Sequence, residues 1–378
     1  MDSICMSIYV IDIEPIPTRY TIHWQEYLPD QIRSYTNHEV INISGGVVPA
    51  STTPGAFLNF SGTNIYKARQ IEQISSLINS NSIKSGDYFL FLDAWNPAVI
   101  QLRYMVELLG LKVKIGGLWH AGSYDPQDFL GRLIGDQPWV RHAEYSMFSC
   151  YDDNFFATQY HIDLFANGIF DWNDGQGWTV NTPQDANDSI KLVGWPMEYS
   201  LDLLSGYDTE SKEDIIVFPH RISKEKQPDI FKDLAASLPE YKFVIAQELN
   251  LSKDEYHELL AKSKLMFSAN LQETLGITSG AEGPLLGCVP IVPDRLSYSE
   301  MFSGFNDLMY PSEWTISWEQ YCANKPKIIS KIHDVMINYD HYRNESDRYL
   351  NKRFNRFFSG HELYQVISQR PRSIKVNK

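Results

Sequence analysis

The chain has 378 residues, of which 43% are hydrophobic and 21% are charged, and its formal net charge at pH 7 is −14. These proportions are typical of a folded globular protein, and they exclude a disordered chain. The length exceeds what one hydrophobic core usually fills and suits two α/β domains. The negative charge argues against a protein that is coated in nucleic acid.

The cysteines bear on the redox compartment. Cys5, Cys150, Cys288 and Cys322 are widely separated, without the close pairs of a zinc site or the density of a disulfide framework. We therefore expect reduced, buried thiols in a cytoplasmic protein. The amino terminus lacks a signal-peptide pattern and no stretch is apolar enough to span a membrane, so we expect a soluble protein with no membrane partner.

The first half of the chain alternates short apolar runs with helical patterns. The predicted strands cover residues 4–13, 38–43, 87–92, 112–118, 154–157 and 190–198. The predicted helices cover residues 18–28, 67–79, a stretch that ends at 109, 139–150 and a stretch that begins at 158. This alternation predicts the α/β class, with a parallel sheet covered on both faces. The loop at 45–60 is long enough to be functional, and residues 170–187 read as a polar surface loop.

Polar side chains follow two of these predicted strands. Asp93 and Trp95 follow the third strand, and His120 and Tyr124 follow the fourth. In α/β folds, ligands bind at the carboxyl ends of parallel strands. The alternative for Asp93 is an N-cap of the next helix, whereas His120 stands in a turn, the opposite of a core position.

The helix after the first strand adds candidates for an acceptor site. Arg19, Tyr20, His23 and Trp24 stand at its start, where the first strand-to-helix turn of a doubly wound domain opens on the ligand crevice. Tyr20 and Trp24 are also four residues apart, a spacing that equally fits two core residues. Both interpretations stay open for this pair.

The second half repeats the alternation, with predicted strands at 214–219, 242–247, 264–268 and 289–292 and predicted helices at 229–237, 253–263 and 280–286. After the first of these strands, Arg221 and Lys226 place two cations at a helix start, an arrangement that suits a phosphate. Further along, Glu273 and Glu282 flank a loop that contains Gly276. Carboxylates accept hydrogen bonds from hydroxyls such as those of a ribose or a hexose. The four charged residues together indicate a sugar nucleotide, although any one of them alone fits an ordinary solvated helix end.

These residues carry a family resemblance. The spacing Arg221-x4-Lys226 and the run that begins at Glu273 resemble the C-terminal half of retaining GT-B glycosyltransferases, in which such a pair holds the donor diphosphate and a Glu-x7-Glu motif holds the donor sugar and ribose. Here eight residues rather than seven separate Glu273 from Glu282. The resemblance implies a catalytic role for Glu273 and donor binding by Arg221, Lys226, Thr274, Leu275, Gly276, Ile277 and Glu282.

Four further segments narrow the resemblance. They are Arg19-Tyr-Thr, Asp93-Ala-Trp-Asn-Pro, Trp119-His-Ala-Gly-Ser-Tyr-Asp and Pro293-Asp-Arg-Leu-Ser-Tyr-Ser-Glu. Together they are similar to bacteriophage glycosyltransferases that decorate hydroxymethylated pyrimidines in DNA, and more weakly to the enzyme that mannosylates queuosine in tRNA. The first likeness implies hydroxymethylcytosine in DNA as the acceptor, a base that must be flipped out of a duplex. It also implies catalytic roles for His120 and Asp93 and acceptor binding by Arg19, Tyr20, Trp95 and Tyr124.

The end of the chain is basic. Between residues 348 and 378, eight basic residues stand against one acidic residue, Glu362. Four aromatic residues are interleaved with them: Tyr349, Phe354, Phe357 and Phe358. Such a tail can bind phosphates and stack on bases. The alternative is a C-terminal helix that packs its aromatic side chains on the body of the protein and leaves its charges in water.

The resemblance implies a GT-B fold, in which two Rossmann-like domains face each other across a cleft. The expected parts are an acceptor-side domain at 1–197, a nucleotide-sugar-binding domain at 198–345, and a C-terminal helix and basic tail at 346–378 that crosses back to the first domain. The expected reaction is transfer of a glucosyl or arabinosyl group from a UDP-sugar with retention. Alternatives are an acceptor on a glycan or on a modified tRNA base, or a GT-B nucleotide-sugar epimerase.

The expected chemistry needs no metal and no cofactor. Arg221 and Lys226 would stabilise the charge on the leaving diphosphate, the work that a metal does in other transferases. No Asp-x-Asp motif stands at a suitable strand end. The group that takes the acceptor proton stays open between Asp93, His120 and a phosphate oxygen of the donor.

Overall fold

The computed structural model describes residues 6–17, 19–47, 58–135, 137–171 and 186–369. The chain divides into two compact units. Unit 1 comprises Met1–Phe156, Ile162–Pro196 and Gly360–Lys378, and unit 2 comprises Ala157–His161 and Met197–Ser359. The boundary expected between residues 345 and 346 falls inside a helix of unit 2, and the chain returns to unit 1 at Gly360.

Unit 1 is built on a six-stranded sheet with the order β2-β1-β3-β4-β5-β6, in which all neighbouring strands are parallel. The strands are β1 Ser7–Ile11, β2 Glu39–Ile43, β3 Tyr88–Phe91, β4 Lys114–Leu118, β5 Asp153–Phe156 and β6 Ile190–Leu192. All four residues of β3 are buried, because a parallel sheet is covered on both faces and its strands then read as continuous apolar runs. The α/β class expected from the sequence is therefore confirmed.

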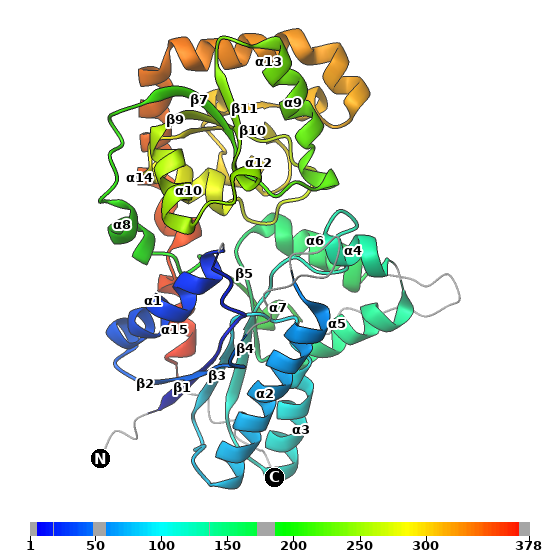
Figure 1. The fold of residues 1–378 in the computed structure, drawn as a ribbon. Helices are drawn as coiled ribbons and strands as arrows, with labels where there is room; N and C mark the ends of the chain where they lie inside the picture. The colour runs from blue at the N-terminus through cyan, green and yellow to red at the C-terminus, as the bar shows by residue number, and fades with distance from the viewer. Residues whose placement is uncertain (1–5, 18, 48–57, 136, 172–185, 370–378) are drawn as a thin grey trace. The chain divides into compact units, whose positions relative to one another are not determined.

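Helices cover both faces of this sheet. They are α1 Tyr20–Thr36, α2 Phe60–Asn79, α3 Ala98–Leu109, α4 Phe129–Ile134, α5 Pro138–Cys150, α6 Gln159–Ile169, α7 Ala186–Ser189 and α15 His361–Ile367. In Figure 1, α2 and α3 lie side by side over one face, and α1 lies with α15 over the other. The prediction for α1 ended at residue 28, but the helix continues through Pro29 because Trp24, Leu28 and Ile32 form one buried stripe.

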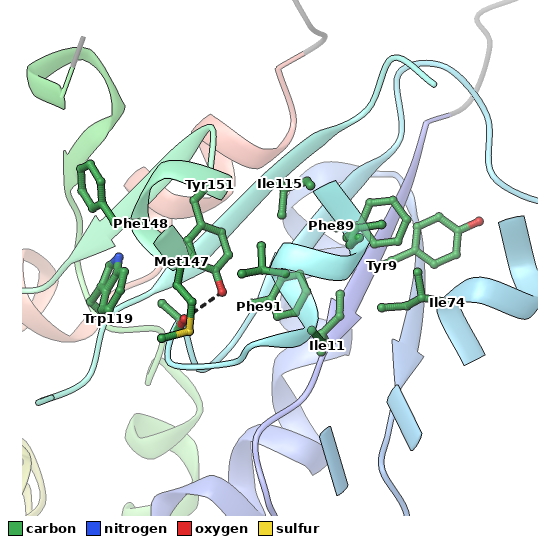
Figure 2. Close-up of a cluster of buried hydrophobic side chains, with 14 of the residues drawn as sticks. Tyr9, Ile11, Ile74, Phe89, Phe91, Ile115, Trp119, Met147, Phe148 and Tyr151 are labelled. Carbon is green, nitrogen blue, oxygen red and sulfur yellow. Dashed lines mark hydrogen bonds between the residues drawn. The ribbon is translucent and has the colours of Figure 1, made fainter. Parts of the chain in front are cut away.

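The core of unit 1 is rich in aromatic side chains. Tyr9 and Phe89 stack on neighbouring strands with ring centroids 5.0 Å apart, and Phe91 and Trp119 belong to the same buried cluster (Figure 2). The Tyr151 hydroxyl donates to the Ala94 carbonyl at 2.9 Å, so a buried polar group is satisfied inside an apolar environment. This core holds the carboxyl ends of β3 and β4 in place.

Unit 2 is built on a five-stranded parallel sheet with the order β11-β10-β9-β7-β8. The strands are β7 Glu213–Phe218, β8 Lys242–Ile245, β9 Ser263–Phe267, β10 Val289–Asp294 and β11 Met309–Pro311. The helices are α8 Tyr199–Leu204, α9 Pro228–Ser237, α10 Lys253–Lys262, α11 Gly283–Leu285, α12 Ser297–Met301, α13 Trp318–Ile337 and α14 Tyr339–Phe358. A capping box between Ser252 and Glu255 begins α10, as its sequence favours.

The C-terminal helical region consists of α13 and α14, which meet at Asn338. None of the helices in the described ranges combines the length and the apolar character that a membrane crossing requires.

The four aromatic side chains of the expected base-stacking tail, Tyr349, Phe354, Phe357 and Phe358, are all buried.

The stacking interpretation of these aromatic residues is therefore wrong. Tyr349 packs against Phe302 with ring centroids 4.3 Å apart, and a ring that is packed inside the protein has no face left for a base. Arg370, Arg372, Lys375 and Lys378 lie outside the described residues, as do most of the expected functional loop at 45–60 and of the polar loop at 170–187.

Candidate functional site

The strand order of unit 1 places a switch point between β1 and β3, because β2 lies on the other side of β1. Ligands of open α/β sheets bind outside the carboxyl ends of the strands at such a point. Glu14 follows β1, Asp93 follows β3, and His120 follows β4. The fold thus places residues that are far apart in the sequence at the carboxyl ends of neighbouring strands.

His120 uses both of its ring nitrogens. Nε2 lies 2.7 Å from the Leu92 carbonyl oxygen, and Nδ1 lies 3.0 Å from the Tyr20 hydroxyl. A carbonyl only accepts, so Nε2 carries the proton and Nδ1 accepts from Tyr20. Burial lowers the pKa of His120 and outweighs the opposite effect of the Asp93 carboxylate. A ligand therefore interacts with the neutral His120 ring in one of two ways. It contacts the ring through the Tyr20 hydroxyl, or it contacts the ring directly after that hydroxyl has moved away.

Asp93 forms an ion pair with Lys67. The Lys67 ammonium lies 2.8 Å from an Asp93 oxygen and donates to the Trp95 carbonyl at 2.6 Å. The other Asp93 oxygen accepts the Trp95 backbone N–H at 3.0 Å. The N-cap alternative for Asp93 is wrong, because the first N–H group of α3 bonds to Asn96 instead.

Trp95 and Tyr124 join the same network through buried partners. The indole N–H of Trp95 donates to Glu144 at 3.1 Å, and the Ser123 hydroxyl donates to the other Glu144 oxygen at 2.8 Å. The Tyr124 ring is buried, and its hydroxyl donates to the His120 carbonyl at 2.8 Å. Tyr124 thus holds the loop that carries His120, while the Trp95 side chain is partly exposed.

The candidate residues at the start of α1, Arg19, Tyr20 and Trp24, lie in two different environments. The Arg19 guanidinium lies 5.8 Å from the centre of the Tyr20 ring, and both side chains are partly exposed. Trp24 is fully buried, and its indole N–H donates to the Pro196 carbonyl at 2.9 Å. Of the two interpretations left open for Tyr20 and Trp24, the core one holds for Trp24.

Glu14 is a residue that sequence reasoning missed at this edge. It is 2% exposed, and its Oε1 atom has no hydrogen-bond partner among the described residues. Burial raises the pKa of Glu14, Asp93 raises it further, and Lys67 and Arg19 partly offset these effects. The missed signal is its place just after an apolar strand, as for Asp93 and His120.

Glu14 should make folding stability depend on pH. Its raised pKa means that the folded state binds the proton more tightly than the unfolded state. This contribution is complete below the ordinary glutamate pKa and is lost as pH rises through the raised one. Glu14→Gln is therefore expected to gain stability relative to the wild type as pH rises from about 4 to 8, measured by urea unfolding.

The exposed Glu26 of α1 gives the matched control, since Glu26→Gln removes a carboxylate that water already solvates. Its stability difference from the wild type should stay nearly flat over the same pH series. A flat difference for Glu14→Gln as well would mean that Glu14 is ionised in the folded protein, and would remove it from the candidate site.

Unit 2 has its own switch point, between β7 and β9. His220 follows β7, and its Nε2 lies 2.6 Å from the hydroxyl oxygen of Ser268, which follows β9. Arg221 comes next, with its Nη2 at 2.6 Å and its Nε at 2.9 Å from one oxygen of Glu225. Glu225 is fully buried, so it holds the guanidinium in a fixed position.

Lys226 and Glu273 meet at the same edge. Lys226 ends a 3₁₀ turn at Lys224–Lys226, and its buried ammonium lies 3.3 Å from a Glu273 carboxylate oxygen. The ammonium also donates to the backbone carbonyl and the side-chain amide of Gln272. The structure thus brings Lys226 into contact with Glu273, and it pairs Arg221 with Glu225, the residue next to Lys226.

The loop after Glu273 is held by backbone contacts. The Thr158 hydroxyl donates to the Thr274 carbonyl at 2.8 Å, and Leu275 and Ile277 are partly exposed. A Cβ atom on Gly276 would stand 2.6 Å from the Tyr298 ring. Glycine is therefore required here for close packing.

Glu282 has different contacts from those of Arg221, Lys226 and Glu273. It is buried, with one oxygen 2.6 Å from the Lys253 ammonium and 3.6 Å from Nε2 of His257. Burial alone would raise the pKa of Glu282, but the Lys253 charge and the nearby His257 ring hold it below its usual range. The expected role of Glu282 at a ribose stays a prediction.

The unusual eight-residue spacing has a structural counterpart. Residues Thr278–Glu282 form a π-helical turn, which continues into α11. A π turn closes over one residue more than an α turn, so it accommodates a single inserted residue. The spacing between the two glutamates is visible in the sequence, but the π-helical conformation of the segment is seen only in the tertiary structure.

Four residues of unit 2 escaped sequence reasoning: His220, Glu225, Lys253 and Gln272. Glu225 stands between the two selected cations, and its spacing of four from Arg221 is the available signal. Within the described ranges, no group of three or more His, Cys, Asp or Glu residues has an arrangement that could hold a metal ion. That metal is dispensable stays a prediction about the reaction.

Comparisons with known proteins concern the fold. No protein-family model matches the sequence, and the search of curated proteins finds no match. Sucrose-phosphate synthase from Thermosynechococcus elongatus superposes with a TM-score of 0.59 at 9% identity, covering 96% of each chain. A glycosyltransferase from Rickettsia africae gives 0.56 at 11% identity, covering 96% of this chain and 99% of its own. Anabaena HepE in complex with UDP and glucose gives 0.55 at 12% identity, covering 96% and 97%.

These likenesses extend over nearly the whole chain, so both units share the architecture of the GT-B proteins. The fold class expected from the sequence is confirmed, with parallel sheets of six and five strands. At such low identities the likeness says nothing about substrates. The closer resemblance to bacteriophage enzymes stays a sequence-based expectation.

Proposed function

We propose that the protein is a glycosyltransferase that moves a sugar from a UDP-sugar to a hydroxyl group, with retention at the anomeric carbon. The observation that carries this proposal is the cluster at the switch point of unit 2. Arg221 and Lys226 supply cations for a diphosphate, and Glu273 supplies a carboxylate for sugar hydroxyls. The shared fold with a protein that is named as a glycosyltransferase supports the same reaction class.

The chemistry follows from where charge develops. The bond between the anomeric carbon and the phosphate oxygen breaks, a bond to the acceptor oxygen forms, and negative charge accumulates on the leaving diphosphate. Cations fixed in advance stabilise that charge without a cost of reorganisation at the moment of reaction. Arg221 is fixed by Glu225, and Lys226 by the Gln272 carbonyl. The acceptor proton leaves to Asp93, to His120 through Tyr20, or to the departing phosphate.

We propose hydroxymethylcytosine in DNA as the acceptor. The motif resemblance in unit 1 supports this choice, and the basic residues after 348 offer charge for phosphates. The buried aromatic side chains of α14 contribute nothing to it, because they cannot stack on bases. With a net charge of −14, binding to DNA is confined to a restricted patch and is salt-sensitive.

One experiment tests both levels of the proposal. The protein is incubated with UDP-glucose, UDP-arabinose and other UDP-sugars, and with hydroxymethylcytosine DNA, unmodified DNA or a glycan, in the presence of EDTA. We expect a mass shift only on the hydroxymethylcytosine nucleoside, and an α-linked product from an α-linked donor. Cation side chains rather than a metal stabilise the leaving group, so EDTA should leave the rate unchanged.

The other outcomes discriminate among the alternatives. Modification of the glycan alone would discard the DNA acceptor and keep the glycosyltransferase, and a tRNA substrate in the same panel tests the modified tRNA base. An epimerised free sugar without any acceptor product would favour the epimerase. Loss of activity in EDTA that Mg²⁺ restores would contradict the metal-free reaction. The absence of turnover with every donor would contradict the proposal as a whole.

A further inference from the structure

The Lys226 ammonium has its hydrogen-bonding capacity filled within the protein. It contacts three acceptors: the Gln272 carbonyl, the Gln272 amide oxygen at 3.3 Å and a Glu273 carboxylate oxygen at 3.3 Å. An ammonium group has three N–H donors. A phosphate that binds Lys226 must therefore displace one of these partners.

The Glu273 carboxylate is the partner most easily exchanged. Its contact with Lys226 is longer than the 2.7–2.9 Å typical of charge-assisted hydrogen bonds, and its second contact, from the Asn270 amide, is also long at 3.4 Å. The Glu273 side chain is 19% exposed, against 7% for Lys226. The carboxylate can thus turn toward a ligand, whereas the buried ammonium stays on the fixed backbone carbonyl of Gln272.

We infer that Lys226 and Glu273 release each other when a donor binds, and that each then contacts the ligand instead. The phosphate takes the ammonium from Glu273, and a sugar hydroxyl then donates to the carboxylate that has been released. This inference rests on the proposed function and adds a selection rule to it. The site favours nucleotides that carry both a diphosphate and a polyol.

The selection has a simple electrostatic origin. A nucleoside diphosphate without a sugar binds Lys226 but leaves the Glu273 carboxylate with no cation and next to a phosphate of like charge. A polar group that loses its partner and gains no other weakens binding. A sugar hydroxyl removes this penalty, because it supplies a donor to the carboxylate at the moment when the ammonium leaves.

The test is a comparison of two dissociation constants. Isothermal titration of UDP and of UDP-glucose into the wild type, Glu273→Gln and Glu273→Ala gives the ratio Kd(UDP)/Kd(UDP-glucose) for each protein. Removing the carboxylate charge frees Lys226, so UDP should bind several-fold more tightly, while UDP-glucose loses its charged acceptor. We expect the ratio to fall about tenfold in both variants, the size of one hydrogen bond to a charged group.

The matched control is Asp214→Asn. Asp214 pairs with Lys264 at 2.6 Å, but it stands near the amino end of β7, whereas the site lies at the carboxyl ends of the strands. This variant also loses one carboxylate from a Lys ion pair, so a nonspecific effect of net charge would appear in it. Its ratio should equal that of the wild type.

Three results would overturn the inference. An unchanged ratio in the Glu273 variants would show that Lys226 and Glu273 do not exchange partners, and an equal fall in Asp214→Asn would assign the effect to net charge. Weaker UDP binding in the Glu273 variants would contradict release of Lys226. If the wild type binds neither UDP nor UDP-glucose, the proposed function fails together with the inference, a result distinct from the others.

Discussion

Lys226→Ala is expected to lower kcat/KM for sugar transfer from UDP-glucose by about 30- to 1000-fold. This range corresponds to about 2–4 kcal/mol, the stabilisation lost when one fixed donor to a developing charge is removed. Lys226 is buried and held by the Gln272 carbonyl, so it is in place before charge develops on the leaving diphosphate. Steady-state transfer assays measure the loss.

The pattern of the loss separates leaving-group stabilisation from simple donor binding. A transition-state role lowers kcat and kcat/KM together, whereas uniform binding raises KM alone. Lys232→Ala is the control, since Lys232 lies on α9 in an exposed pair with Glu248. If Lys226→Ala keeps the wild-type kcat and changes KM alone, then Lys226 binds the donor without stabilising the leaving group.

The role of Arg221 requires a different mutational experiment. Its guanidinium neutralises Glu225, which is fully buried. Removing one member of a buried pair leaves an unpaired charge and destabilises the fold. The effect of Arg221→Ala is therefore read on a background of Glu225→Gln, in which no buried charge is stranded, and with the unfolding midpoint measured alongside the rate.

His120→Ala is expected to lower kcat by about 100-fold with little change in stability. The neutral ring links the Leu92 carbonyl to the Tyr20 hydroxyl at the switch point of unit 1. Without the ring, Tyr20 loses the acceptor that orients its hydroxyl. Single-turnover rates with saturating UDP-glucose and hydroxymethylcytosine DNA isolate this step from donor binding.

Two comparisons make this prediction specific. Tyr20→Phe removes only the hydroxyl and should lose a comparable factor if the proton leaves through Tyr20. His341→Ala removes an exposed histidine from α14 and should behave as the wild type. A His120→Ala variant with the wild-type kcat would assign the ring to packing against Trp195, whose ring centroid lies 4.9 Å away.

Local sequence patterns were sufficient to place most strands and helices. Runs such as 87–92 are apolar throughout because a parallel strand is buried on both faces, and the helices between them are amphipathic. Parallel pairing in turn made the carboxyl ends of the strands the place to look for a site. This position in the fold singles out Asp93, His120 and Arg221 in the sequence.

Local patterns failed where a residue's role depends on its spatial neighbours. Glu14, Lys67 and Glu225 look like ordinary solvated charges in the sequence, yet each is buried at a sheet edge. The aromatic residues of α14 are interleaved with basic ones, and the spacing alone does not tell which face of the helix is covered. Burial against Phe302 decided that question.

The alternation of strands and helices, the parallel α/β class and the spacing of the charged residues follow from local sequence, because they depend on the periodicity of apolar side chains and on short-range turn chemistry. Which of these charges meet depends on the tertiary fold. Lys226 and Glu273 are separated by 46 intervening positions, and their 3.3 Å contact exists because the strand order sets β7 beside β9. The strand order is a property of the whole sheet, and no local pattern encodes it.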